Sequence, residues 1–222
     1  MEIEMDLWAL WTNVFTASIS MLTSHLGISE ALSIMLMTLC VRAALMPLSL
    51  ASAYQMHKNK LAMAKLKPIQ ARLSEQHKSN PGELIKQTMA LYREHGISFF
   101  TKAMLGNMAS RSVFGMGFFH ALSGISFTSK FLWLASLARP DFVLNILVGV
   151  LMFFGLILMP GAASDASSML VMMIPVIVSI IALSTLPAAI GVYWASSNMA
   201  TIVQALLLKG MIRRAEQRAL PV

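Results

Sequence analysis

The chain contains 222 residues, of which 57% are hydrophobic and only 12% carry charged side chains, with a formal net charge of +7 at pH 7. Water-soluble domains carry about 25% charged residues, so this composition argues against a soluble enzyme or a soluble binding domain. Long continuous apolar runs and a mean hydropathy of +0.69 instead predict an all-α polytopic membrane protein. The single cysteine, Cys40, excludes an intrachain disulfide.

The first 27 residues combine acidic side chains with large apolar ones. Glu2, Glu4 and Asp6 stand directly before residues 7–11, which read LWALW. We interpret residues 1–27 as an amphipathic helix that lies in the outer membrane interface. The simpler interpretation is an aromatic anchor, because tryptophan is enriched at the boundary between membrane and water.

Five apolar segments follow, each close to the length that a hydrocarbon core of about 30 Å requires of a helix. These predicted spans are residues 28–53, 103–122, 142–159, 168–183 and 188–208. Lysine and arginine are concentrated between the first two spans and in a short tail, residues 209–222. Because four spans separate these basic segments, both lie on one side of the membrane, which the positive-inside rule identifies as the cytoplasm. The N-terminus then lies outside.

Residues 55–95, between the first two spans, are polar and have helical periodicity. Their apolar residues form two helix faces: Leu66, Ile69 and Leu73 on one, and Ile85, Met89 and Tyr92 on the other. Asn80 is suited to cap a helix and Pro81 to begin it. Glu83 completes a start that resembles a capping box, and Gly96 is suited to end the helix. This pattern predicts an antiparallel helical hairpin in the cytoplasm.

The positive charge of this hairpin has two interpretations. As a docking arm, it would bind anionic partners such as lipid head groups, ribosomal RNA or a targeting factor. Alternatively, it is a solvated hairpin whose lysines and arginines only fix the orientation of the chain in the membrane.

Arg42 is the most informative residue, because it lies about twelve residues from either end of the first predicted span, near the bilayer midplane. A guanidinium keeps its proton at any ordinary pH. Placing that charge at mid-membrane depth costs roughly 2.5–3.5 kcal/mol on insertion scales. A chain that tolerates this cost surrounds the arginine with water or uses its charge. Pro47 follows five residues later and is expected to kink the helix.

Arg111 is a second arginine within a predicted span, at a depth comparable with that of Arg42. Few carboxylates are available to pair with either one, so a hydrated cavity is the economical solution. The alternative for Arg111 is that its side chain extends to the inner head groups. Polar residues of the last span would either wet one wall of this cavity or join helices together; they include Tyr193, Trp194, Ser197, Asn198 and Gln204.

Motifs for catalysis or for cofactor binding are missing from the sequence. It contains no HExxH zinc motif, no GxSxG nucleophile motif, no phosphate-binding loop and no dinucleotide-binding fingerprint. We also find no inverted repeat, which weakens the interpretation as a secondary transporter. The sequence therefore predicts neither a catalytic residue nor a metal site.

Four motifs, in this order and with this topology, resemble the YidC/Oxa/Alb family of membrane protein insertases. Residues 38–49 read TLCVRAALMPLS, similar to the family's T-L-x-V-R-x-x-x-x-P-L-S/T. Residues 63–69 read MAKLKPI and residues 91–97 read LYREHGI, like the family's M-x-x-L-x-P and L-Y-K-E-H-G-V. The loop sequence FLWL followed by PD resembles the family's F-L-W-I…P-D, and PAAIGVYWASSN at residues 187–198 resembles P-A-G-L-x-L-Y-W-x-x-S/T-N. The resemblance extends from about Trp8 to Met211.

The resemblance implies a fold and a function. The expected fold is a five-helix insertase core over residues 28–208, including the hairpin, arranged around a groove that is open to the cytoplasm and closed toward the outside. The expected function is that of a membrane protein insertase or chaperone, not an enzyme and without a cofactor, which helps hydrophobic segments of newly made proteins enter and fold in the bilayer. The expected location is the bacterial inner membrane rather than an organelle.

The resemblance and the buried polar residues together imply site residues and partners. The expected groove residues are Arg42, Arg111, Tyr193, Trp194, Ser197 and Asn198, and the expected structural kinks are Pro47 and Pro187. The expected partners are nascent membrane proteins and membrane lipids. The ribosome, a targeting factor and the Sec translocon are further candidates, and no DNA is involved.

One departure from the family pattern concerns the second span. The family usually begins this span with N-P-L-G-G-C-L-P followed by Q-x-P, whereas here the sequence lacks the glutamine and has Arg111 after Ala109 and Ser110. Two other function classes remain open on the sequence alone. They are a small-solute transporter or channel, and a passive assembly factor that chaperones subunits without inserting them.

Overall fold

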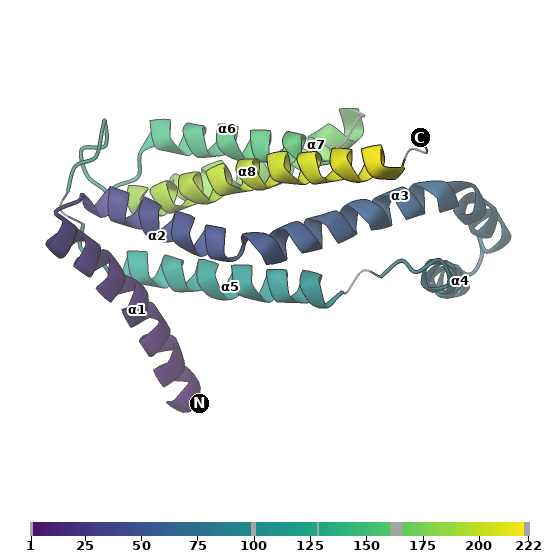
Figure 1. Ribbon diagram of the computed structural model, residues 1–222, viewed down its shortest axis with the longest axis horizontal. Helices are drawn as coiled ribbons and strands as arrows, with labels where there is room; N and C mark the ends of the chain where they lie inside the picture. The colour runs from purple at the N-terminus through teal and green to yellow at the C-terminus, as the bar shows by residue number, and fades with distance from the viewer. Residues whose placement is uncertain (1, 99–100, 128, 161–165, 220–222) are drawn as a thin grey trace. The chain divides into compact units, whose positions relative to one another are not determined.

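A computed structural model describes residues 2–98, 101–127, 129–160 and 166–219, and over these residues the fold consists of eight α-helices (Figure 1). They are α1 (Glu2–Leu26), α2 (Glu30–Ala44), α3 (Met46–Gln76), α4 (Pro81–Glu94), α5 (Lys102–Ser123), α6 (Phe142–Leu158), α7 (Ala166–Leu183) and α8 (Ala188–Ala219). The prediction of an all-α fold is therefore confirmed. The chain forms two compact units, a larger one of Met1–Met46 with Ala109–Val222 and a smaller one of Pro47–Met108.

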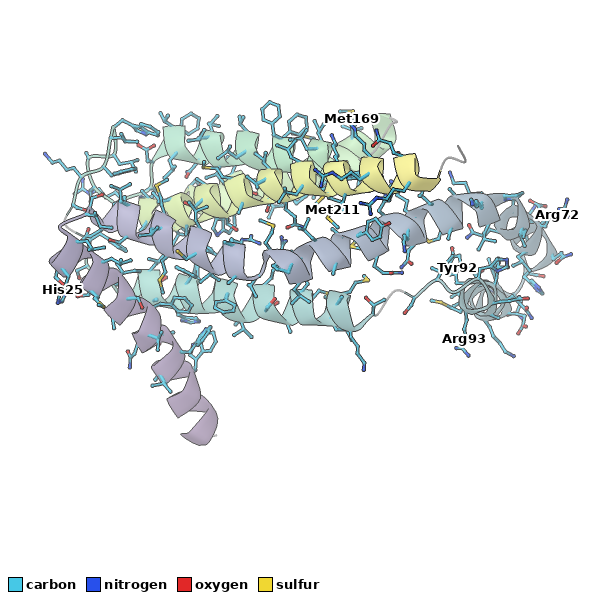
Figure 2. All side chains as sticks on the ribbon, in the orientation of Figure 1. His25, Arg72, Tyr92, Arg93, Met169 and Met211 are labelled. Atoms are coloured by element: carbon cyan, nitrogen blue, oxygen red, sulfur yellow. The ribbon has the colours of Figure 1, made fainter. Side chains whose placement is uncertain are left out.

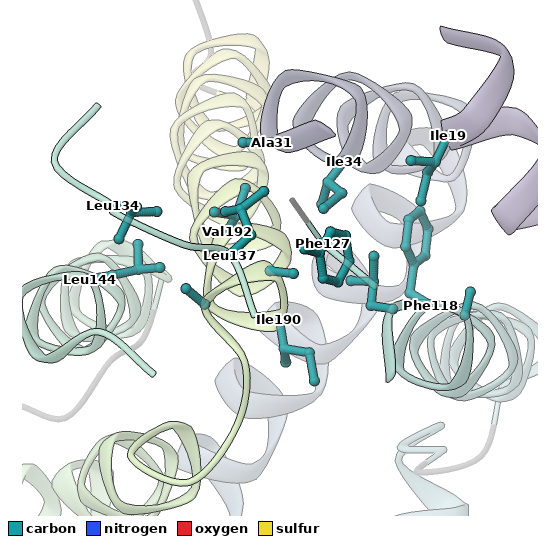
Figure 3. Close-up of a cluster of buried hydrophobic side chains, with 14 of the residues drawn as sticks. Ile19, Ala31, Ile34, Phe118, Phe127, Leu134, Leu137, Leu144, Ile190 and Val192 are labelled. Atoms are coloured by element: carbon teal, nitrogen blue, oxygen red, sulfur yellow. The ribbon is translucent and has the colours of Figure 1, made fainter. Parts of the chain in front are cut away.

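In the larger unit, α8 is the central helix. It packs along α6 on one side and along α2 on the other, α7 packs against α6, and α1 packs against α2 (Figure 1). The core between these helices is apolar, and its buried side chains come from helices far apart in the sequence (Figure 3). Ile34, Phe118, Val148 and Ile190 in this core are at most 1% exposed. This core sets the rotation of α2, α5 and α8 about their axes.

Gly117 allows α1 to approach α5 closely. A Cβ atom at this position would lie 2.5 Å from Nε1 of Trp11 and 2.9 Å from the ring of Phe15. The Trp11 indole also donates a hydrogen bond of 3.3 Å to the carbonyl oxygen of Val113 on α5. The absence of a side chain at Gly117 is therefore a condition for the packing of the two helices.

The loop between α5 and α6 is held by specific hydrogen bonds. Phe131 and Leu134 form an isolated antiparallel β-bridge. Asp141 caps α6, where its carboxylate accepts from the backbone N–H of Leu144 at 2.7 Å and from the Trp133 indole at 3.2 Å. These contacts explain the FLWL and PD sequences as a local structure, because Asp141 serves both the loop and the helix start.

Two further contacts tie this loop to the helices of the larger unit. Glu30, in the first turn of α2, accepts hydrogen bonds from the backbone N–H and the hydroxyl of Ser129 at 3.1 and 2.6 Å. The backbone N–H groups of Ala188 and Ala189 donate to the carbonyl oxygens of Arg139 and Leu137, both at 3.0 Å. The loop therefore satisfies backbone donors at the start of α8.

The smaller unit contains the predicted helical hairpin, formed by α3 and α4. Asn80 caps α4 by accepting from the Glu83 N–H at 3.2 Å, and Pro81 is the first residue of the helix. At the other end, Gly96 has a φ of +67°, and the Ile97 N–H donates to the carbonyl oxygen of Tyr92 at 2.8 Å. This is a Schellman ending, which requires a left-handed residue that glycine adopts without strain. The predicted start and end of α4 are confirmed.

The arrangement of α4 against α3 differs from a simple antiparallel pair. Figure 1 shows α4 nearly along its axis, whereas most of α3 lies across the view. Pro68 lies inside α3, where it removes a backbone hydrogen bond, and Figure 1 shows α3 turning near its C-terminal end. Tyr92 faces α3 and accepts a hydrogen bond from the Gln70 amide at 2.5 Å, while Arg93 points away (Figure 2).

The first predicted span is broken rather than kinked. Helix α2 ends at Ala44, Leu45 forms a turn, and α3 begins at Met46 with Pro47 as its second residue. Proline is tolerated in the first turn of a helix, because its missing N–H has no partner there. Pro187 likewise lies directly before α8. At both prolines the chain changes direction between helices and not within one.

The other predicted spans correspond to α5, α6, α7 and the first part of α8. Helix α8 continues to Ala219, so the described part of the tail extends the last helix. By length and apolar composition, no single helix in the described residues meets the requirement for crossing a membrane, whereas α2 and α3 meet it together as a bent pair.

We expect Gly117→Ala to lower the free energy of unfolding by about 1–3 kcal/mol, because the added methyl group overlaps the rigid rings on α1. Thermal unfolding of the detergent-solubilised protein would measure the change. Gly210→Ala is the matched control, since a Cβ atom at that position would have nothing within 4 Å. In helix α8 this substitution should stabilise by about 0.5–1 kcal/mol. Equal effects of the two substitutions would contradict the proposed packing of α1 on α5.

Candidate functional site

A cavity of about 220 Å³ opens between α2, α5 and α8 in the larger unit. Its lining combines two guanidinium groups with apolar and aromatic walls. The lining residues are Thr38, Val41, Arg42, Leu45, Arg111, Phe114, Gly115, Phe118 and Tyr193. Three residues that the sequence predicts for the groove, Arg42, Arg111 and Tyr193, are thus brought together from three different helices.

Arg42 lies in the last turn of α2 and is half-buried. Its Nε donates to the hydroxyl oxygen of Ser197 on α8 at 2.9 Å, and its Nη2 donates to the same oxygen. Because α2 ends at Ala44, the guanidinium also lies near a helix C-terminus, where the helix dipole stabilises a cation by about 0.3–1 kcal/mol. The helix break next to Pro47 therefore lowers the cost of the charge.

Arg111 approaches α8 from the opposite helix, α5. Its Nη2 donates to Oε1 of Gln204 at 3.4 Å, a long hydrogen bond. The arginine side chain is exposed, whereas Gln204 is only 4% exposed. Arg111 is therefore joined to a buried amide by a weak hydrogen bond, while its guanidinium also borders the cavity.

Neither guanidinium forms an ion pair with a carboxylate in the part of the chain that the structure describes. The ion pairs described there join Lys78 to Glu75 and Lys86 to Glu83, all in the smaller unit. The two arginines of the cavity are thus held by neutral acceptors, a hydroxyl and an amide oxygen. Two like charges held in this way are tolerable only where water enters, so the cavity is suited to bind an anionic group.

Tyr193 forms an aromatic wall of the cavity. Its ring stacks on that of Phe118 with a centroid distance of 4.9 Å and an interplanar angle of 13°. A Cβ atom on Gly115 would lie 3.4 Å from the Tyr193 hydroxyl oxygen, so this hydroxyl lies close to α5 at Gly115. The stack fixes the orientation of Tyr193 relative to α5.

The remaining predicted groove residues have different positions. Ser197 contributes through its hydrogen bonds with Arg42. Trp194 packs against the apolar core, and the Asn198 amide donates to the Trp194 carbonyl oxygen at 2.9 Å, within its own helix. Trp194 and Asn198 do not line the cavity. A polar residue on the last span can therefore be satisfied by its own helix without facing the groove.

Sequence reasoning did not assign most of the cavity wall. Phe114, Gly115 and Phe118 follow Arg111 at spacings of three, four and seven residues, which places them on one face of α5. Thr38 lies four residues before Arg42 on α2, and Leu45 lies three residues after it, in the turn that ends this helix. Helical periodicity around the two arginines could have found these residues. Gln204, noted only as a polar residue of the last span, proves to be the partner of Arg111.

The chemistry available at this site is electrostatic. The lining supplies positive charge, hydrogen-bond donors and aromatic surface. In the residues described by the structure, no three His, Cys, Asp or Glu side chains come together as a possible metal site. The arrangement is suited to attract a negatively charged group and to release it again, because water screens the attraction.

Sequence comparison with known proteins finds a family match that spans the residues of the cavity. Residues 21–215 match the model of the family described as 60Kd inner membrane protein, and this range includes every lining residue. The chain is 28% identical over 197 residues to the membrane protein insertase YidC of Clostridium tetani, covering 86% of this chain and 86% of that protein.

Two other relatives have similar names. The chain is 29% identical over 194 residues to the membrane protein insertase MisCA of Bacillus subtilis, covering 83% of this chain and 72% of that protein. It is 30% identical over 208 residues to the membrane protein insertase YidC 1 of Listeria monocytogenes, covering 87% of this chain and 69% of that protein.

We expect the cavity to admit water, which cysteine labelling can measure. In a protein with Cys40 replaced by serine, Leu45→Cys should react with a water-soluble maleimide, because thiolates form where water is present. Val148→Cys is the matched control, since Val148 is 0% exposed in the core; it should react only after unfolding. If Leu45→Cys were as unreactive as Val148→Cys, the cavity would be dry.

Proposed function

This chain is a membrane protein insertase of the YidC/Oxa family, the 60Kd inner membrane protein family, and we propose that its two-arginine cavity is part of a groove that receives substrates. Insertases of this family are not enzymes, and their substrates are newly made membrane proteins. The family is polytopic and belongs to the cytoplasmic membrane of bacteria. The observation that carries the proposed site is the pair of guanidiniums, Arg42 and Arg111, held by neutral partners in one cavity.

We propose five membrane spans that surround this groove. They are the broken helix α2 with the start of α3, then α5, α6, α7 and the first part of α8. The groove opens to the cytoplasm and to lipid and is closed toward the outside. The loop between α5 and α6 would provide that closure, which is supported by its hydrogen bonds to the starts of α2 and α8.

In the proposed mechanism, Arg42 attracts the polar or acidic end of an incoming segment into the wet groove. At about 4 Å and an effective dielectric constant near 20, the attraction of two unit charges is roughly 4 kcal/mol, before desolvation and screening reduce it. Tyr193 would form the wall of the groove and Ser197 would hold Arg42 in place. Trp194 and Asn198 would support the groove from behind, through the core and the backbone of α8.

An apolar surface is available next to the groove helices for the transmembrane part of the substrate. Large side chains of α7 are highly exposed, among them Leu170 at 71%, Val171 at 65% and Ile181 at 64%. A substrate helix would slide along such a surface into the bilayer. Burial of its apolar residues, at about 25 cal/mol per Å², would drive the step forward without nucleotide hydrolysis.

The flanking segments have proposed roles as well. Residues 1–27 would lie at the outer interface, which is supported by α1 having Phe15 and Ile19 buried in the core while Leu10, Val14 and Met21 are exposed. The basic hairpin, residues 55–95, would dock lipid head groups, the ribosome, a targeting factor or the Sec translocon from the cytoplasm. The tail, residues 209–222, would lie on the same side.

We expect Arg42→Lys to retain more insertion activity than Arg42→Ala, because charge rather than bidentate geometry is proposed to act. The measurement is insertion of a single-span protein with a short acidic outer tail into liposomes that contain the purified protein. The alanine variant should lose at least about tenfold, equivalent to 1.4 kcal/mol. Equal losses in both variants would argue for specific hydrogen bonds of the guanidinium instead.

The proposed orientation predicts which cysteines can be labelled from each side. In a background without Cys40, Glu75→Cys in the hairpin and Arg214→Cys in the tail should react with a membrane-impermeant reagent only from the cytoplasmic side. Ala138→Cys, in the loop between α5 and α6, should react only from outside. The three positions are exposed in the fold. Labelling of Glu75→Cys from outside would overturn the topology.

A further inference from the structure

The arginines of the cavity present two positive charges in succession along α8. Their acceptors, Ser197 and Gln204, are seven residues apart, which is two helical turns and about 10 Å of rise on one face of the helix. Both acceptors are buried, at 8% and 4% exposure, so each acceptor is fixed at a defined level along α8. A single small anion bound beside one of the two acceptors would interact more strongly with the nearer arginine than with the other.

The two guanidiniums differ in how firmly they are held. Arg42 directs two donors to one hydroxyl, with the Nε bond at 2.9 Å, whereas Arg111 has one described bond of 3.4 Å to the Gln204 amide. A guanidinium has five N–H donors, so both arginines keep donors for a ligand. Arg111 therefore loses less hydrogen-bond energy than Arg42 when it turns to a new acceptor.

We propose that Arg111 makes the cavity selective for substrate segments that carry two acidic residues a few positions apart, with Arg42 as the fixed site and Arg111 as the adjustable one. The proposal rests on the function proposed above and names the substrate class of the same groove. An extended tail rises about 3.3 Å per residue. Side chains two positions apart in an extended tail lie on the same face, about 7 Å apart, so two such carboxylates can enter one cavity and reach both guanidiniums, which line it together.

Gln204 is a positioning residue in this proposal. Its amide oxygen accepts from Arg111 without cancelling the charge, so the arginine is oriented but stays available to a carboxylate. A glutamate at the same position would form an ion pair with Arg111 and would remove the second binding site while keeping the shape of the side chain.

The experiment compares four substrates in liposomes of neutral lipid that contain the whole chain. The substrates are single-span proteins whose short outer tails carry no aspartate, one aspartate, two aspartates two positions apart, or two aspartates ten positions apart. The readout is the rate of insertion of each tail relative to the tail without aspartate. This ratio cancels any general effect of a substitution on folding or on insertion.

For the unmodified protein, we expect the substrate with the closely spaced aspartates to insert about threefold to tenfold faster than the substrate with the widely spaced ones. This range corresponds to the screened attraction of one carboxylate to one further positive charge. In Arg111→Gln and in Gln204→Glu this preference should fall to about one, while Arg111→Lys should keep most of it. Arg213→Gln is the matched control for loss of one positive charge, because Arg213 is exposed in the basic tail; it should keep the full preference.

Several results would overturn the proposal. They are equal insertion of the two paired tails by the unmodified protein, an unchanged preference in Arg111→Gln, or a preference that follows the content of anionic lipid rather than the spacing of the aspartates. The last result would assign Arg111 to lipid phosphate. Failure of the proposed function itself is distinguishable, because then no tail would insert faster than into liposomes without protein.

Discussion

A guanidinium keeps its proton at any ordinary pH, so the larger unit must stabilise the charge of Arg42 among helices that are largely apolar. It does so in three ways. The break at Leu45 places the arginine at the C-terminal end of α2, where the helix dipole favours a cation. Packing of α2 along α8 brings the Ser197 hydroxyl within hydrogen-bond distance. The third is the cavity, which leaves the rest of the guanidinium open to water. The close helix packing around Gly117 and the loop fixed by Asp141 maintain the bundle in which these conditions hold together.

Arg111 changes the character of this cavity from a single charge to a pair. Arg111 adds this second charge from α5, and Gln204 on α8 accepts its hydrogen bond. Neutral acceptors hold both arginines without neutralising them. A carboxylate from the protein itself would have satisfied the charges more firmly and would have closed the site to anionic substrates. The combination of a cationic cavity with the exposed apolar surface of α7 would suit the proposed insertion mechanism, in which a substrate has a polar end and an apolar span.

The smaller unit follows mainly local rules. Asn80 and Pro81 start α4, and the left-handed Gly96 ends it with a Schellman motif. These contacts involve residues close together in the chain, so they could be read from the sequence. The crossing of α4 against α3 could not, because it depends on contacts such as the hydrogen bond between Gln70 and Tyr92, which joins residues from different helices.

The sequence by itself determined the all-α membrane fold and the ends of α4 and singled out Arg42 as a candidate site residue, because apolar run length, capping chemistry and a charge that cannot be neutralised are properties of a few neighbouring residues. Only the tertiary structure decided that α2 breaks at Leu45, that Arg111 meets Gln204, that Phe118 stacks on Tyr193, and that Asn198 turns back to its own helix. Each of these depends on how α2, α5 and α8 are rotated and shifted against one another. That arrangement is set by the packing of the whole core, through contacts between residues more than 90 positions apart such as Arg111 and Gln204, and no local pattern encodes it.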